Sequence, residues 1–366
     1  VLTLSVVFCI VKSHSILFQW GLPHLFYMFL ISPNKKENQM NYQEFLQYIK
    51  DNFLGYLKDY EQRQIVGKDT TKDCDNKYTV ELHEITKNNG IKLDGLIIRK
   101  DNENISPNIY LNSYFEDYQL GTPITRIMEE IAKQYFTIAS EHRIKVDNLL
   151  DYNAIRNQII FRLVNYEKNR EVLKKCPYKR FLDLAVTYRY MAQKDENGIA
   201  SSLISYDEFS NWEIEEEELY RIALFNTMRE FPWHMDSLAT VILDCLKRTL
   251  PDEAHEELSE EFAMLEETKG GVNMYVLSND SDLNGASCIL YDSVIRNFAR
   301  VQGGNIIILP SSIHEVILVP EEEDTDIEFL QNLVIDANQS AVGLIDLLSD
   351  SVYYYDLEQD EFRIYG

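Results

Sequence analysis

The chain has 366 residues, enough for about two or three domains, and its hydrophobic content of 45% excludes wholesale disorder. Sixty acidic residues against 35 basic ones give a formal charge of −25, which repels a phosphate backbone and argues against general nucleic-acid binding. The five cysteines are scattered and form no C-x-x-C pair, which argues against a disulfide framework and a structural zinc site and indicates a reducing, cytoplasmic compartment.

Residues 1–39 differ in composition from everything that follows, because they are apolar and nearly uncharged. They resemble a signal peptide or a membrane anchor, but a basic start and an A-x-A-like cleavage site are lacking. Lys36-Glu37 can be encoded as a ribosome-binding sequence shortly before Met40. We therefore interpret 1–39 as upstream DNA read in frame, with a signal or anchor as the alternative. A start at Met40 predicts no membrane attachment.

Residues 40–143 predict an N-terminal α+β unit. Apolar residues at helical spacing indicate a first helix beginning at Tyr42, followed by a loop over 61–77. Two alternating runs around Asn89-Gly90 predict a β-hairpin, and 108–121 can add a third strand. A second helix follows Pro123, with an apolar stripe made of Ile124, Ile127, Met128, Ile131 and Tyr135.

Residues 144–268 predict a mainly helical middle unit that contains one hairpin. Helices are expected over 151–175, and two strands are expected around a turn at 195–198. Two further helices are expected, one after Trp212 and one over 235–249. The glycine-containing stretch 266–273 is typical of a hinge.

Residues 269–366 predict a C-terminal α/β sandwich-like unit. The fold class expected for the whole chain is therefore α+β, multidomain, with small mixed sheets packed with helices. The elements expected in this last unit are strands at 274–278, 286–291, 305–310 and 313–319, helices at 292–302 and 326–339, and a terminal hairpin.

Several segments resemble an uncharacterised bacterial family that is classed as a domain of unknown function. They are MNYQEF, HEITKNNGIKLDGLIIR, PNIYLNSYFEDYQLG, VLSNDSDLNGAS and ILPSSIHEVILVP. The resemblance runs from Met40 to near the C-terminus, in line with a start at Met40. The strand at 183–188 and the helix that contains Glu217-Glu218-Leu219, Ala223 and Asn226 resemble a second unassigned bacterial family more distantly. The resemblance implies a soluble cytosolic protein and no assigned activity.

Polar residues at 311–315 form the first candidate site. In an extended strand Ser312 and His314 would share one face, as a serine nucleophile and its base must, with Glu315 as a nearby acid. However, Pro310-Ser311-Ser312 lies between two expected strands and does not match the nucleophile elbow G-x-S-x-G. The sequence therefore favours a tight turn, with binding through an exposed loop as the second interpretation and catalysis as the third.

The loop at 277–287 is the second candidate site. Its D-x-D-x-N spacing resembles a calcium loop, but position 291, where a carboxylate ligand would stand, is a tyrosine. We expect this loop and 310–315 to converge at one end of a sheet and to form any ligand or partner surface. The residues assigned to that surface are Ser278, Asn279, Asp280, Asn284, Ser311, Ser312 and His314.

Other patterns predict no further chemistry. The histidines are scattered without H-E-x-x-H spacing, so no metal site and no cofactor are expected. The acidic runs at 215–218 and 321–324 stand at expected helix starts, where the helix dipole favours negative charge.

The sequence therefore favours a non-catalytic, acidic, cytosolic module for binding or regulation, with an unknown protein partner. A hydrolase that uses Ser312 and His314 is the alternative, and an acidic mimic of nucleic acid is the second alternative.

Overall fold

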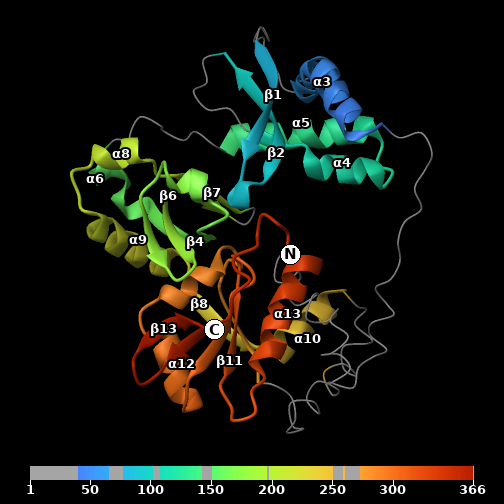
Figure 1. Cartoon of the computed structure of the whole chain (residues 1–366). Coiled ribbons are helices and arrows are strands. Elements are labelled where there is room, and N and C mark those ends of the chain that lie inside the picture. Colours follow the sequence, from blue (N-terminus) through green and yellow to red (C-terminus); the bar gives the residue numbers. More distant parts are fainter. Residues whose placement is uncertain are drawn as a thin grey trace. The chain divides into compact units, whose positions relative to one another are not determined.

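The computed structural model describes residues 40–65, 77–101, 108–141, 151–195, 198–249, 259 and 273–365. The segment 1–39 and nearly all of the expected hinge at 266–273 lie outside these residues. The described residues form two compact units, an N-terminal unit up to residue 141 and a C-terminal unit from residue 151 (Figure 1). Among the described residues no helix combines the length and the apolar character needed to cross a bilayer.

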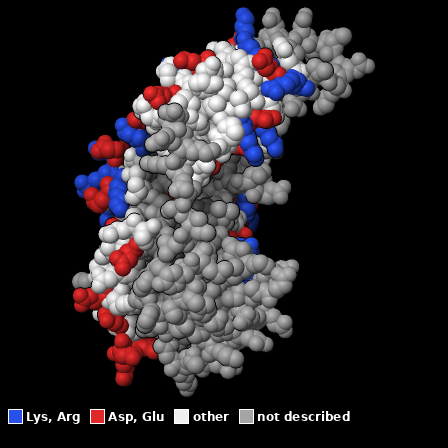
Figure 2. Space-filling model, turned by 90° about the vertical axis from the view of Figure 1, so that its right-hand side faces the viewer, with Lys and Arg blue, Asp and Glu red and all other residues white. Residues whose placement is uncertain are grey.

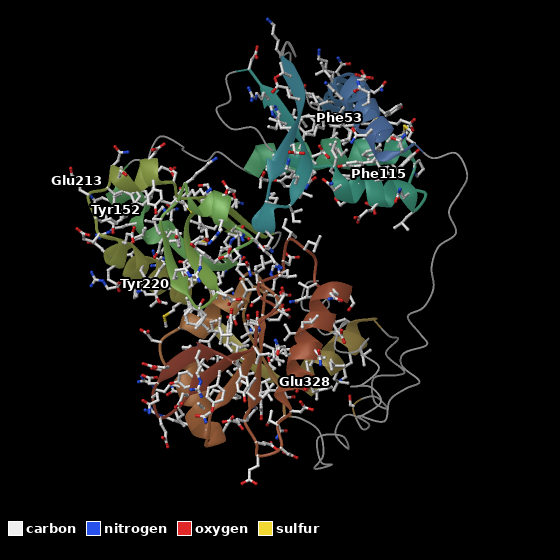
Figure 3. The ribbon with its side chains drawn as sticks, viewed as in Figure 1. Phe53, Phe115, Tyr152, Glu213, Tyr220 and Glu328 are labelled. Carbon is white, nitrogen blue, oxygen red and sulfur yellow. The ribbon has the colours of Figure 1, made fainter. Side chains whose placement is uncertain are left out.

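The N-terminal unit packs helices against one antiparallel sheet in the order β1-β2-β3. The expected hairpin is present, and Asn89 and Gly90 adopt the positive φ angles that its turn requires. The expected third strand is only three residues long, and the chain then turns into helix α4. Figure 3 shows Phe53 from α3, which belongs to the buried core of this unit, and Phe115 from α4, which packs against that core. The elements are α3 (Tyr42–Ile65), β1 (Tyr78–Thr86), β2 (Lys92–Lys100), β3 (Asn108–Tyr110), α4 (Asn112–Gln119) and α5 (Ile124–Glu141).

The C-terminal unit contains a four-stranded antiparallel sheet with β6 at its centre. Strand β4 pairs with one edge of β6, and β5 and β7 pair with the other edge. The prediction of helices over 151–175 is wrong for IIFRLVN, which forms β4, because branched and aromatic side chains pack well on a pleated surface. The elements are α6 (Tyr152–Ile155), β4 (Ile159–Asn165), α7 (Arg170–Leu173), β5 (Tyr178–Phe181), β6 (Leu184–Asp195), β7 (Gly198–Leu203), α8 (Tyr206–Ser210) and α9 (Glu216–Glu230).

A six-stranded antiparallel sheet forms the rest of this unit, in the order β13-β12-β10-β11-β9-β8. Alternate residues of β10 point to opposite faces, so Ile306 and Ile308 pack with α12, whereas Ile307 and Leu309 pack with α10 and α13 (Figure 1). The elements are β8 (Trp233–Ser237), α10 (Leu238–Thr249), β9 (Tyr275–Asn279), α12 (Val294–Gln302), β10 (Ile306–Leu309), β11 (Val316–Pro320), α13 (Ile327–Ser340), β12 (Tyr353–Asp356) and β13 (Glu361–Ile364).

Two expectations for this region are wrong. Residues 286–291 are not a strand, because Gly285–Leu290 form a 3-10 helix, and β8 occupies the start of the helix expected at 235–249.

The boundary expected at 268 does not separate two cores. Phe161 of β4 and Leu219 of α9 share one hydrophobic core with Ile306 of β10. The α+β class with small sheets is confirmed, and all the strand pairs of the described residues are antiparallel.

Asp183 joins the two sheets of the C-terminal unit. It precedes β6, and its carboxylate accepts hydrogen bonds from Ser349 Oγ at 2.6 Å, from Ser351 Oγ at 3.2 Å and from the Tyr353 hydroxyl. Asn165 of β4 adds a second link, because its side-chain amide donates to the Leu348 carbonyl at 2.9 Å. These links fix residues 346–349, which form one wall of the candidate site.

Candidate functional site

The site lies where the connection between β10 and β11 meets two other segments. Residues 310–315 are not the expected tight turn. They form a six-residue connection whose backbone bonds to 346–349 on one side and to the start of the 3-10 helix on the other. Ile313 N–H donates to the Asp346 carbonyl at 2.8 Å, and Ala286 N–H donates to the Ile313 carbonyl at 3.2 Å. The expectation of an exposed loop is also wrong, because Ser311, Ser312, His314 and Glu315 are all buried.

Gly285 allows the loop after β9 to approach the 310–315 connection. A Cβ atom at this position would lie 2.2 Å from Ser278 Oγ and 2.3 Å from the His314 carbonyl oxygen, both too short for any side chain. Asn284 precedes it with φ 56°, in the left-handed region that asparagine tolerates. The two polar segments singled out in the sequence therefore lie in direct contact.

The serine and asparagine side chains of the site bond to nearby backbone. Ser278 Oγ donates to the His314 carbonyl at 2.9 Å, and the Asn279 amide donates to the Leu283 carbonyl at 2.9 Å. Ser312 Oγ accepts the His314 N–H at 3.0 Å. Such bonds replace water for buried backbone groups and hold both segments in one conformation.

His314 is nearly enclosed, with 7% of its side chain exposed. Its Nδ1 accepts the Asn284 N–H at 3.3 Å, which places the proton of the neutral ring on Nε2. Nε2 faces Asp346 Oδ1 at 3.3 Å, within ion-pair distance but outside hydrogen-bond geometry. Among the described residues, no hydrogen bond joins the ring to Ser312 Oγ.

Glu315 is a buried carboxyl group whose Oε1 has no hydrogen-bond partner among the described residues. Burial raises the pKa of Glu315 to about 8, although a hydrogen bond from Ser312 acts in the opposite direction. The nearby carboxylates of Asp282 and Asp346 raise it further. Glu315 is therefore mostly protonated at neutral pH, an unusual state that requires an explanation.

Arg162 on β4 is a site residue that sequence reasoning missed. Burial lowers its pKa, and the negative charge of Asp346, the carboxylate that also meets His314, opposes that shift. Its buried Nε has no acceptor among the described residues. The signal in the sequence was a lone arginine inside the apolar run IIFRLVN. Because a helix was predicted there, the sequence did not indicate which face of a sheet this arginine would occupy.

The remaining predicted residue, Asp280, is exposed and lies apart from the buried group. His234 Nδ1 of β8 is 3.8 Å from Asp280 Oδ1, and His234 Nε2 is 4.0 Å from Asp282 Oδ1. Across the described residues, no three His, Cys, Asp or Glu side chains are grouped in a way that would hold a metal ion. The D-x-D-x-N spacing thus supplies surface carboxylates beside a histidine.

The model of a family of unknown function, DUF5688, matches residues 42–357. The chain belongs to DUF5688. The match includes most of the N-terminal unit and nearly all of the C-terminal unit, with every residue of the candidate site. No curated protein and no solved structure matches this DUF5688 chain.

Proposed function

We propose that the protein is a non-catalytic binding or regulatory module of the cytosol. The observation that carries this proposal is the bonding of Ser312 and His314, the serine and histidine of the first candidate site. Ser312 Oγ accepts a backbone N–H, and the His314 ring meets Asn284 and Asp346. A hydrolase requires the serine to donate to the imidazole, and an acid to support that imidazole from behind. Cys176 and Cys288 carry buried thiols outside any disulfide, which supports a reducing compartment.

The surface best suited to a partner lies next to the buried group, along β8. Strand β8 ends the six-stranded sheet, and in the described part of the chain no strand pairs with its outer edge. Its first residue, Trp233, is 48% exposed, and tryptophan is enriched at the centres of protein interfaces. A sheet edge of this kind accepts an extended segment of a partner through backbone hydrogen bonds.

Charge defines the partner that this edge favours. Asp236 of β8 and Asp280 are exposed and Asp282 is partly exposed, and Asp280 and Asp282 lie beside the His234 ring. An extended, basic protein segment would complement these carboxylates. On the face drawn in Figure 2, Lys and Arg side chains lie among the Asp and Glu side chains in the upper part, whereas the lower left edge shows Asp and Glu alone.

Capture of partners by the tagged full-length chain from its native host, followed by binding measurements with the purified partner, tests the proposal. We expect Trp233→Ala and Asp280→Lys each to weaken binding at least about tenfold, because both sit on the β8 surface. Phe225→Ala is the matched control, since Phe225 is 67% exposed but lies on α9. Undiminished binding by Trp233→Ala would exclude this surface.

The hydrolase alternative has its own test. A serine nucleophile reacts with a fluorophosphonate probe and loses that reaction on Ser312→Ala. We expect the native chain to remain unlabelled at Ser312, because the hydroxyl is buried and bonded to backbone. Labelling that disappears in Ser312→Ala would replace the binding proposal with the hydrolase.

A further inference from the structure

Two arginines lie side by side on the face of the four-stranded sheet that points away from its main core. Arg162 of β4 pairs with Thr187 of β6, and Arg189 of β6 pairs with Ile160 of β4. Paired residues of an antiparallel sheet share a face, so the two arginines are diagonal neighbours, about 7–8 Å apart at the backbone. The opposite face carries Phe161 and its neighbours of the main core.

Apolar side chains flank the arginine pair on this outer face. One small cluster contains Val164, Leu173, Cys176 and Ala185, and another contains Ile160, Met191 and Phe231. Each arginine keeps partial exposure to solvent, while Arg162 Nε is fully screened from it. The guanidinium groups therefore stand in a partly buried setting of low dielectric constant, where charge interactions are strong.

The charges of the two arginines are poorly compensated by the protein. Arg189 Nε donates to Ser201 Oγ at 2.9 Å, and its Nη2 donates to the Ser201 carbonyl at 2.9 Å, so neutral groups hold this side chain. The side chain of Arg162 donates no hydrogen bond to any residue that the structure describes. Within the same described residues, neither arginine has a carboxylate at ion-pair distance, although the chain has 60 acidic residues against 35 basic ones. In a chain with so many carboxylates, two partly buried arginines without a carboxylate partner require an explanation.

Asp346 is the carboxylate that acts on Arg162, and it does so from a distance. Among the described residues, the group at ion-pair distance from Asp346 is the His314 ring and not Arg162. Burial lowers the pKa of Arg189 to about 9, and the neighbouring charge of Arg162 lowers it as well. Both guanidinium groups still carry their charge at neutral pH, so two like charges share a half-buried face. A bound anion would relieve their repulsion and satisfy the free donors of Arg162.

We propose that Arg162 and Arg189 together bind an oxyanion, a phosphate or carboxylate group of a ligand, on the outer face of the four-stranded sheet. The planar fork of a guanidinium matches two oxygens of either group. The site is separate from the partner surface on β8 and goes beyond the binding role proposed there. Asp346 lies at the margin of the oxyanion site and competes with the ligand for Arg162.

Titration of the ¹⁵N-labelled full-length chain tests this proposal, with inorganic phosphate in one arm and acetate in the other, at constant ionic strength set by chloride. The Nε–H signals of Arg162 and Arg189 are the direct readout, and the Arg162→Gln and Arg189→Lys variants assign them. We expect saturable shifts of both signals with a dissociation constant on the order of 1 mM. The arm that gives the tighter constant identifies the oxyanion class.

Substitutions then test which side chains bind the anion. Arg162→Gln is expected to weaken binding at least about tenfold, with its fold intact because the replaced side chain makes no hydrogen bond. Arg221→Gln is the matched control, because Arg221 is exposed on α9, against the opposite face of the sheet. Asp346→Asn is expected to tighten binding several-fold by removing the competing charge.

The proposal is overturned if neither signal shifts saturably up to about 50 mM of either anion, some fifty times the expected constant. It is equally overturned if Arg162→Gln binds as the native chain does, or if Asp346→Asn weakens binding. Trp233→Ala is expected to bind the anion normally, so failure of the β8 surface and failure of the oxyanion site are distinguishable.

Discussion

Glu315 makes the stability of the C-terminal unit depend on pH. Its pKa is raised from the model-compound value of 4.5 to about 8, chiefly by burial. The folded state therefore keeps a proton that the unfolded chain releases above about pH 4.5, so stability falls as pH rises from there towards 8 and is constant beyond. The shift corresponds to a total loss of about 3–5 kcal/mol.

Glu315→Gln removes this titration, because an amide resembles the protonated acid. Between pH 5.5 and pH 8 the native chain is expected to lose about 2–4 kcal/mol of its free energy of unfolding through this group, and the variant is not. The free energy of unfolding of the variant relative to the native chain therefore rises by that amount. Urea denaturation at a series of pH values measures the difference. Glu358→Gln, at an exposed position in the terminal hairpin, is the control and is expected to show no such slope. A difference independent of pH would show that Glu315 is ionised in the folded protein.

Gly285 is predicted to be intolerant of any side chain. Gly285→Ala forces Ser278 or the His314 carbonyl to move, because the added Cβ would approach both within 2.3 Å. We expect a loss of about 2–4 kcal/mol in the free energy of unfolding, as for overpacked cores. Gly304→Ala is the matched control in the same unit, since a Cβ there meets no atom within 4 Å. Equal stabilities of the two variants would contradict the close contact.

At the scale of elements, Asp183 is predicted to dock one sheet of the C-terminal unit on the other. Asp183→Ala removes the acceptor of three hydroxyl groups, from Ser349, Ser351 and Tyr353. We expect a loss of about 2–4 kcal/mol, because buried donors are left without acceptors. Urea denaturation measures it, with Asp292→Ala at an exposed position as the control, expected within about 0.5 kcal/mol of the native chain.

Elements with a long, regular pattern could be predicted from the sequence, and short apolar segments could not. The hairpin of β1 and β2 and helices α3, α5, α9, α12 and α13 follow from periodicity and turn residues. Strand β4 was missed because seven apolar-rich residues fit a buried helix and a buried strand equally well. Strand β8 was missed because its partner β9 lies across a long connection.

The candidate site was located only in part by sequence. The contact between 277–287 and 310–315 was expected, but the burial of Ser312 and His314 was not, since polar residues beside a proline usually indicate a solvent-exposed turn. Asp346 and Arg162 come from distant segments that no local pattern connects. Their approach depends on the packing of two sheets, which the sequence does not reveal by periodicity.

For the whole molecule, the separate cores predict separate unfolding. The core of the N-terminal unit contains Phe53, and the main core of the C-terminal unit contains Phe161. Phe53→Ala in the full-length chain is expected to destabilise the N-terminal unit by about 3–5 kcal/mol and to leave the other unit unchanged, while Phe161→Ala does the reverse. Hydrogen exchange followed by mass spectrometry resolves the two. Equal loss of protection in both units after either substitution would show that they unfold together.

The links from Asp183 to Ser349 and from Asn165 to Leu348 have a consequence for synthesis on the ribosome. They join residues separated by 166 and 183 positions in the chain. The N-terminal unit needs only its own residues and can fold as soon as they emerge. The four-stranded sheet must wait, with part of its apolar surface uncovered, until the last strands leave the exit tunnel. We therefore expect a nascent chain that has released residues 151–231 but not 346–365 to expose apolar surface that the complete chain buries.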